Sequence, residues 1–149
     1  MTPHFLDVVG LFVMLAGFVI GLGAVTVIDL HGFLGRKSAY WTEATTRTHK
    51  VTKPLIWIGM FLVIVGGFVF YRNYGLEKVT LIHLMSACLM IINGIFLSFS
   101  VSPFLLQRER EGKSSELLPK SWQVKITFSF IISFVLWWGN LFLVVYNLV

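Results

Sequence analysis

Four long stretches of the chain carry no acidic or basic side chain, and short charged segments join them. These apolar runs cover residues 8–28, 54–71, 79–107 and 126–149. A helix needs about 20 apolar residues to cross a hydrocarbon core of about 30 Å, so each run is long enough for one crossing. The runs are continuously apolar rather than alternating, which argues against a membrane barrel. The pattern predicts an all-α integral membrane protein, with one domain over 1–149 and a four-transmembrane-helix bundle over about 5–31, 52–72, 79–106 and 122–147.

The composition agrees with this interpretation. Of 149 residues, 56% are hydrophobic and 13% are charged, whereas soluble domains carry about 25% charged residues. The segment before the first run lacks the basic start of a cleavable signal peptide, and the run itself is too long for one. We therefore expect the first helix to remain in the mature chain.

The basic side chains gather in two of the three expected connections. Only Arg72 and Lys78 lie in the middle connection; the first and third hold Arg36, Lys37, Arg47, Lys50, Lys53, Arg108, Arg110, Lys113, Lys120 and Lys125. By the positive-inside rule, loops 1 and 3 should face the cytoplasm of a bacterial inner membrane, with both termini outside. The net charge of +5 then meets anionic lipid on one face, so the lipid bilayer suffices as its partner and no nucleic acid is required.

Small residues predict how the helices pack. Gly10, Gly17 and Gly21 share one face of the first helix, and Gly59 and Gly66 lie in the second. Small side chains let backbones approach closely in lipid, so we expect the glycine face of the first helix to contact a neighbouring helix.

The two halves of the chain are weakly similar to each other. Aligning Val51 with Val124 also aligns Gly66 with Gly139. This favours a parallel duplication of a two-helix unit, with chance identity among apolar residues as the alternative.

Few side chains can carry chemistry. No charged residue lies within an apolar run, so a pump built on buried carboxylates is not expected. Motifs for hydrolysis and phosphate binding are absent, and the single Cys88 excludes thiol exchange between two cysteines. Asn93 and Asn140 are expected to form hydrogen bonds between helices.

The four histidines fall into two pairs by their place along the helices. His4 and His83 are expected at the outer ends of the first and third helices, and His31 and His49 at the inner ends of the first and second. Two imidazoles from facing helices can be axial ligands of b-type haem, and the same pair could bind copper or zinc. The alternative is that all four are interfacial or capping residues, with His31 and His49 held in a hydrogen-bonded basic loop.

The outer pair has further candidate residues around it. Asp7 follows His4 by three positions and could accept its second ring N–H, as carboxylates do behind ligating histidines. His83 shares a helix face with Gly94. In the haem hypothesis, His4 and His83 are the ligands, while Gly17 and Gly94 make room for the macrocycle.

Part of the chain resembles a known superfamily. A histidine near the start (His4), then Leu15-Ala16-Gly17-Phe18 and His31-Gly32 before the basic loop, resemble the small four-helix bacterial membrane proteins that include the copper-resistance D type and the haem-binding protoporphyrinogen oxidase J type. The likeness covers about the first 35 residues and the four-helix plan. It implies a haem or copper function for His4 and His83.

The sequence thus favours a cytochrome b-like membrane protein that binds b-type haem between helices, for electron transfer or for handling haem or porphyrin. Two alternatives remain open. One is a noncatalytic accessory subunit, which would pack its glycine faces against membrane protein partners or in a homo-oligomer. The other is a copper-handling membrane protein. The sequence does not decide whether the chain is an enzyme.

Overall fold

The computed structural model describes residues 5–73 and 78–148. Within these ranges the chain is helical, without strands, and four helical rods are long and apolar enough to cross a membrane. The elements are α1 (Phe5–Gly35), α2 (Ala39–Tyr71), α3 (Lys78–Phe96), the π-helical turn η1 (Leu97–Val101), α4 (Ser102–Arg110) and α5 (Lys120–Leu148). The third rod is α3, η1 and α4 in succession. The expected all-α four-helix bundle is confirmed.

Three helix boundaries differ from the expectation, and all three changes lengthen the bundle at its basic end. The third rod ends at Arg110 instead of near residue 106. α1 continues to Gly35 instead of ending near residue 31, and α2 begins at Ala39 instead of near residue 52. The Ser38 hydroxyl caps α2 by accepting a hydrogen bond from the Trp41 backbone N–H. The length of an apolar run reflects only the thickness of the hydrocarbon core. The whole helix α2 has 33 residues and is about 50 Å long, so it extends well beyond that core. The expected basic loop over 32–51 is therefore mostly helix.

The first two helices pack backbone against backbone through their glycines. A Cβ added to Gly17 would lie 2.6 Å from the Val63 amide nitrogen and 2.7 Å from the Gly59 carbonyl oxygen, and one added to Gly10 would lie 2.7 Å from the Phe70 nitrogen. Gly59 in turn approaches the backbone of Gly21. This confirms that the glycine face of α1 contacts a neighbouring helix, and that helix is α2.

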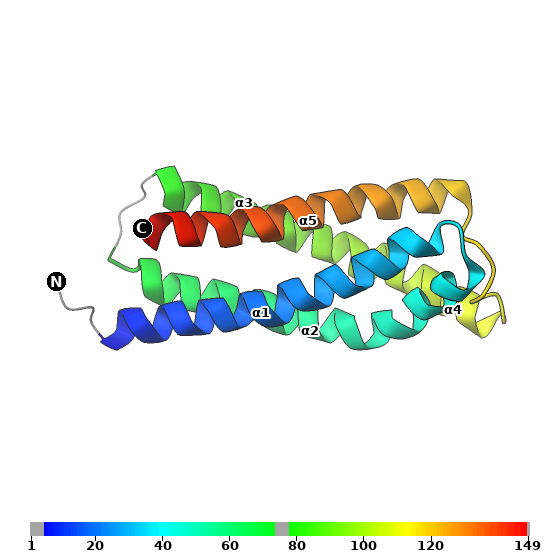
Figure 1. Cartoon of the computed structure of the whole chain (residues 1–149), viewed down its shortest axis with the longest axis horizontal. Helices are drawn as coiled ribbons and strands as arrows, with labels where there is room; N and C mark the ends of the chain where they lie inside the picture. The colour runs from blue at the N-terminus through cyan, green and yellow to red at the C-terminus, as the bar shows by residue number, and fades with distance from the viewer. Residues whose placement is uncertain (1–4, 74–77, 149) are drawn as a thin grey trace.

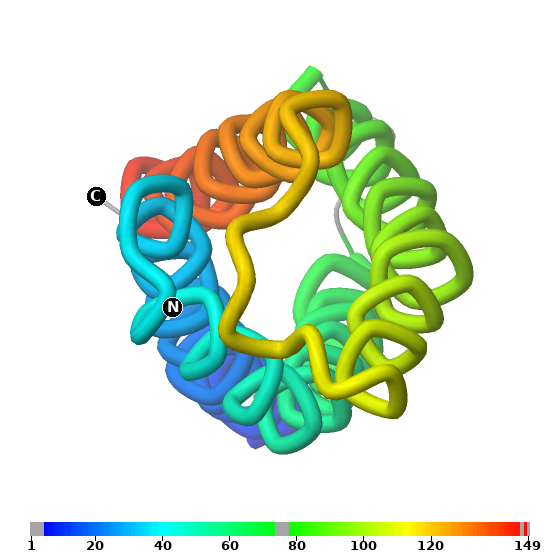
Figure 2. The backbone as a smooth tube through the Cα atoms, turned by 90° about the vertical axis from the view of Figure 1, so that its right-hand side faces the viewer, coloured from blue at the N-terminus to red at the C-terminus, as the bar shows by residue number. Residues whose placement is uncertain are grey.

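Figures 1 and 2 show the four rods in a ring in which α1 lies beside α2 and α3 beside α5. The start of α1 and the end of α5 lie together at one end of the bundle. The proposed duplication of a two-helix unit stays a prediction. Large apolar side chains fill the middle of the ring, and these buried residues include Met14, Phe18, Leu22, Met60, Met90, Trp137 and Val144. Because the middle is packed, groups at the two ends of the bundle belong to separate sites.

Candidate functional site

A cavity of about 100 Å³ lies at the end of the bundle where α1 and α4 end and α2 and α5 begin. We call this end the cationic end, because the basic residues of both expected cytoplasmic loops lie there. All four rods contribute to the wall, and the polar side chains that line it include Asp29, His49, Lys53, Trp57, Ser98 and Gln123.

α2 supplies one continuous face to this cavity. Thr45, His49, Lys53 and Trp57 follow one another at four-residue intervals, and all of them line it. Residues four apart lie on the same side of an α-helix. The hydroxyl group of Thr45 donates to the backbone carbonyl four residues back, at 2.7 Å. Such internal bonding satisfies the hydroxyl without a partner from another helix.

The neighbouring wall, which the third rod supplies, contains a carbonyl group that loses its helical donor in the π-helical register. In η1 the Ser102 N–H bonds to the Leu97 carbonyl oxygen, one residue further back than in an α-helix. In the same register the donor for the Ser98 oxygen would be Pro103, which has no N–H. The Lys53 ammonium group reaches this oxygen at 3.5 Å. A lysine from α2 thus compensates for an irregular turn in the third rod.

Lys53 also belongs to a short chain of polar contacts. Its ammonium group donates to the Ser102 hydroxyl oxygen at 3.4 Å, and that hydroxyl lies 2.8 Å from His49 Nε2. If Lys53 donates to Ser102 and Ser102 donates to Nε2, then His49 is neutral and carries its proton on Nδ1. The Trp57 indole N–H donates to the Ser98 hydroxyl oxygen at 3.0 Å, which leaves the Ser98 proton free for another acceptor.

The charges in the cavity are not paired with each other. Within residues 5–73 and 78–148, Lys53 forms no ion pair. Asp29 also lines the cavity, and its Oδ2 atom is buried without a hydrogen-bond partner in the described part of the chain. Arg36, a second cation of the wall, donates to the Phe33 carbonyl oxygen and stacks on the Phe33 ring. Lys53 is therefore a partly buried cation whose bonds go to neutral oxygens.

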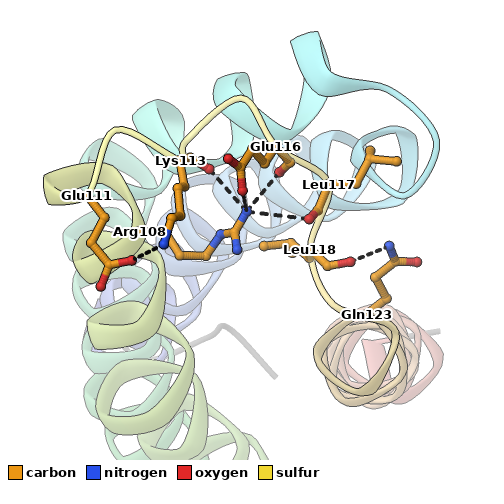
Figure 3. A network of polar contacts seen from close by, with 7 residues as sticks. All are labelled: Arg108, Glu111, Lys113, Glu116, Leu117, Leu118 and Gln123. Carbon is orange, nitrogen blue, oxygen red and sulfur yellow. Dashed lines mark hydrogen bonds and ion pairs between the residues drawn. The ribbon is translucent and has the colours of Figure 1, made fainter.

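A loop crosses the mouth of the ring at this end. Residues 111–119, here called the closing loop, connect α4 to α5 and pass over the opening of the ring (Figure 2). Arg108 holds it by donating to the carbonyl oxygens of Lys113 and Glu116 at 3.1 Å, and to that of Leu117 at 3.4 Å (Figure 3).

The far side of the closing loop is fixed to α5. Gln123 donates to the Leu118 carbonyl oxygen at 2.8 Å (Figure 3), and Leu118 lines the cavity. At the outer edge of the loop, Lys113 is hydrogen-bonded to Glu111 and, as the largest cause, lowers the pKa of that carboxyl group below its usual value. The loop is thus anchored on both sides of the opening.

The opposite end of the bundle holds the histidine expected to face inward. The ring of His83 lies 5.3 Å from that of Tyr71, centroid to centroid. Both His83 ring nitrogens are buried and lack a hydrogen-bond partner in good geometry among the described residues, although the backbone of Asn140 lies near the ring. His4, its expected partner, lies outside the described residues. Asp7 is in an ion pair with Arg72 at 2.8 Å, which joins the start of α1 to the end of α2.

The remaining candidate residues are spread along the bundle. Gly17 lies in the α1–α2 contact, so the backbone of α2 takes up the space in front of it. Gly94 lines the cavity at the cationic end, 11 positions and about 16 Å along the helix from His83. His49 lines the same cavity, but His31 does not; its ring packs against Trp41 at 5.1 Å. The inner histidines do not face one common point.

Asp29, Lys53 and Ser98 were not predicted to form one site. Asp29 and Ser98 lie within expected helices, but the segment before residue 52, which holds His49, was expected to be loop, and Lys53 was counted with its basic residues, so no helical phase linked His49 to Lys53. The four-residue spacing of His49, Lys53 and Trp57 was the available signal, because it predicts one face once the segment is taken as helix.

These features define a small four-helix membrane protein with a largely apolar cavity at its cationic end, into whose wall a few polar side chains are set. In the described part of the chain, no three residues among His, Cys, Asp and Glu gather closely enough to hold a metal ion. Comparison with protein-family models, curated proteins and solved structures gives no match.

Proposed function

We propose that the protein binds a small polar molecule, or the polar head of a larger one, in the cavity at its cationic end. The observation that carries the proposal is the convergence of Lys53, His49, Ser98 and Asp29, from three rods, on one cavity. Binding sites are concave, largely apolar and equipped with a few oriented polar groups, and this cavity has each of these properties. Lys53 places a charged group in the wall of a largely apolar cavity, where a ligand can bind to it.

The size of the cavity limits what it can hold. A water molecule needs at least about 10–15 Å³ of cavity space, so a cavity volume of about 100 Å³ accommodates several waters. A polar group of a few heavy atoms fits the same space, and a larger ligand would extend from the cavity into the membrane interface.

The test is to fill the cavity with a larger side chain and to measure whether a bound molecule is lost. A Cβ at Gly94 would lie 3.5 Å from the Trp57 ring, which is ordinary contact, so Gly94→Leu tolerates the first carbon and directs the rest into the cavity. Gly23→Leu is the matched control, because nothing lies within 4 Å of its Cβ. The wild-type protein and Gly23→Leu, purified in mild detergent, should release one small molecule on denaturation, identified by mass spectrometry. Gly94→Leu should not. Absence of the molecule from the wild type, or its retention by Gly94→Leu, would contradict the proposal.

A second candidate function, b-type haem binding at the opposite end, is favoured by the two unpartnered ring nitrogens of His83. His83 would be one axial ligand, and Tyr71 would fix the plane of its ring by packing against it. His4 is the proposed second ligand. Asp7, engaged by Arg72, would first have to leave that ion pair to orient His4. Haem would supply one-electron transfer, and copper is the alternative at the same histidines.

An absorption spectrum tests the second candidate. After expression with ample haem, the wild-type protein and His49→Ala should show a Soret band that His83→Ala loses. A colourless wild-type preparation would contradict haem binding. Copper binding predicts metal by elemental analysis without that band.

A further inference from the structure

We infer that the group bound at the cationic end is an oxyanion, a phosphate or a carboxylate, and that Lys53 is its counter-ion. This inference rests on the proposed function and names the chemical class of the ligand. Phosphate can come from the headgroup of a membrane lipid or from a free solute, and the two sources share the same recognition chemistry.

The first argument is the state of Lys53. Its ammonium group has three N–H donors, and two of them make long contacts of 3.4 and 3.5 Å to neutral oxygens. This ammonium group is partly buried in a largely apolar wall, where an anion would form a charge-assisted hydrogen bond with it. No carboxylate of residues 5–73 and 78–148 forms an ion pair with it. An incoming oxyanion would take the third donor and supply the missing charge.

The second argument is the set of groups beside Lys53. Ser98 accepts from the Trp57 indole N–H, so its own proton can be donated to an anion. His49, when neutral, has its Nδ1–H available as a further donor. An ammonium group, a hydroxyl group and an imidazole N–H are the donors that phosphate and carboxylate groups accept from.

The third argument is the charge balance of the cavity wall. Among its described residues, Lys53 and Arg36 are cationic and Asp29 is the acidic one, so the wall has an excess of positive charge even with Asp29 ionised. Asp29 lies on α1 and Arg36 directly follows that helix, whereas Lys53 lies on α2 beside Ser98.

The experiment measures binding of inorganic phosphate and of acetate to the purified full chain in detergent, by thermal shift at constant ionic strength. The variants are Lys53→Met, which removes the charge at similar length, and Lys53→Arg, which keeps it. Lys50→Met is the matched control, since Lys50 lies one turn away, is half exposed and pairs with Glu109. A parallel arm compares short-chain phosphatidic acid with the diacylglycerol of the same chains.

We expect an oxyanion to stabilise the wild type and Lys50→Met. Lys53→Met should bind it with a Kd at least tenfold higher, because the loss of a hydrogen bond to a charged group, about 1.5–3 kcal/mol, corresponds to a change of at least that size. Lys53→Arg should restore most of the binding. Stabilisation by phosphatidic acid alone identifies a lipid headgroup as the source, and stabilisation by free phosphate or acetate identifies a solute. Equal binding by Lys53→Met and wild type, or no stabilisation in any arm, would overturn the inference. If a neutral or cationic molecule co-purifies and Gly94→Leu loses it, the proposed function holds and the oxyanion inference fails.

Discussion

Gly17→Ala tests the backbone contact between α1 and α2, because it adds one methyl group between the two helices. Its Cβ would lie 2.6 Å from the Val63 nitrogen and 2.7 Å from the Gly59 oxygen. Ordinary contact begins at 3.4 Å, so α1 and α2 would have to separate locally by about 0.8 Å. Neither atom can rotate away, since both belong to the α2 backbone. Overpacking of this kind costs about 1–3 kcal/mol, which exceeds the gain of about 0.5–1 kcal/mol from replacing glycine in a helix.

Gly23→Ala provides the matched control on the same helix. No atom lies within 4 Å of its added Cβ, so only the helix-propensity gain of at most about 1 kcal/mol should remain. The assay is unfolding of the detergent-solubilised protein with increasing SDS, followed by tryptophan fluorescence. We expect Gly17→Ala to be less stable than wild type by about 1–2 kcal/mol and Gly23→Ala to be equal or more stable. If Gly17→Ala matched Gly23→Ala in stability, the backbone contact between α1 and α2 would be wrong.

Two further predictions concern hydrogen bonds at other places in the bundle. Ser129→Ala removes the buried hydroxyl group that donates to Asn93 Oδ1 at 2.6 Å between α5 and α3. In the same unfolding assay, the free energy of unfolding should fall by about 0.6–1.7 kcal/mol. The control Ser100→Ala, at an exposed serine, should leave it unchanged. Arg108→Gln removes three contacts to the closing loop, and a loss of even about 1 kcal/mol should speed cleavage after Lys113 by a lysine-specific protease about fivefold. Unchanged cleavage would show that Arg108 does not hold the loop.

The helices of this fold could be predicted from the sequence because lipid imposes a simple rule on them. A segment that crosses the hydrocarbon must be helical and apolar over about 20 residues, and four such runs are present. The contact between α1 and α2 was predictable for a similar reason. Gly10 and Gly17 share a helical phase, and small residues mark where backbones meet.

The ends of the helices and the cavity could not be predicted by the same rule. Apolar runs stop where the hydrocarbon stops, but the α2 helix extends back to Ala39, so His49 lies on the same helix as Lys53 rather than in a loop. Pro103 gave a partial signal, since it removes a donor near Ser98. The π-helical register that completes the effect has no comparable signature.

The sequence predicted a loop between the third and fourth membrane helices, but it gave no signal for how the closing loop is anchored. Arg108 bonds to the backbone carbonyl oxygens of Lys113, Glu116 and Leu117, and every residue type carries that acceptor. Arg108 has an arginine two positions away in Arg110, and only the fold tells the anchoring arginine from its exposed neighbour.

Side-specific thiol labelling tests the central claim, a water-accessible cavity at the cationic end of a membrane bundle, most directly. The background is Cys88→Ser, which removes the single cysteine. In this background, Ser98→Cys places a thiol group in the cavity wall. The control Phe99→Cys places one on the neighbouring face of the helix, where Phe99 is 76% exposed toward lipid. Thiols react as thiolates, which require water. We predict that a small, charged, membrane-impermeant thiol reagent modifies Ser98→Cys from the cytoplasmic side only and leaves Phe99→Cys unmodified. An anionic reagent should modify Ser98→Cys faster than a cationic reagent of similar size. Equal reaction at both positions, no reaction at Ser98→Cys, or reaction from the outer side would contradict the account.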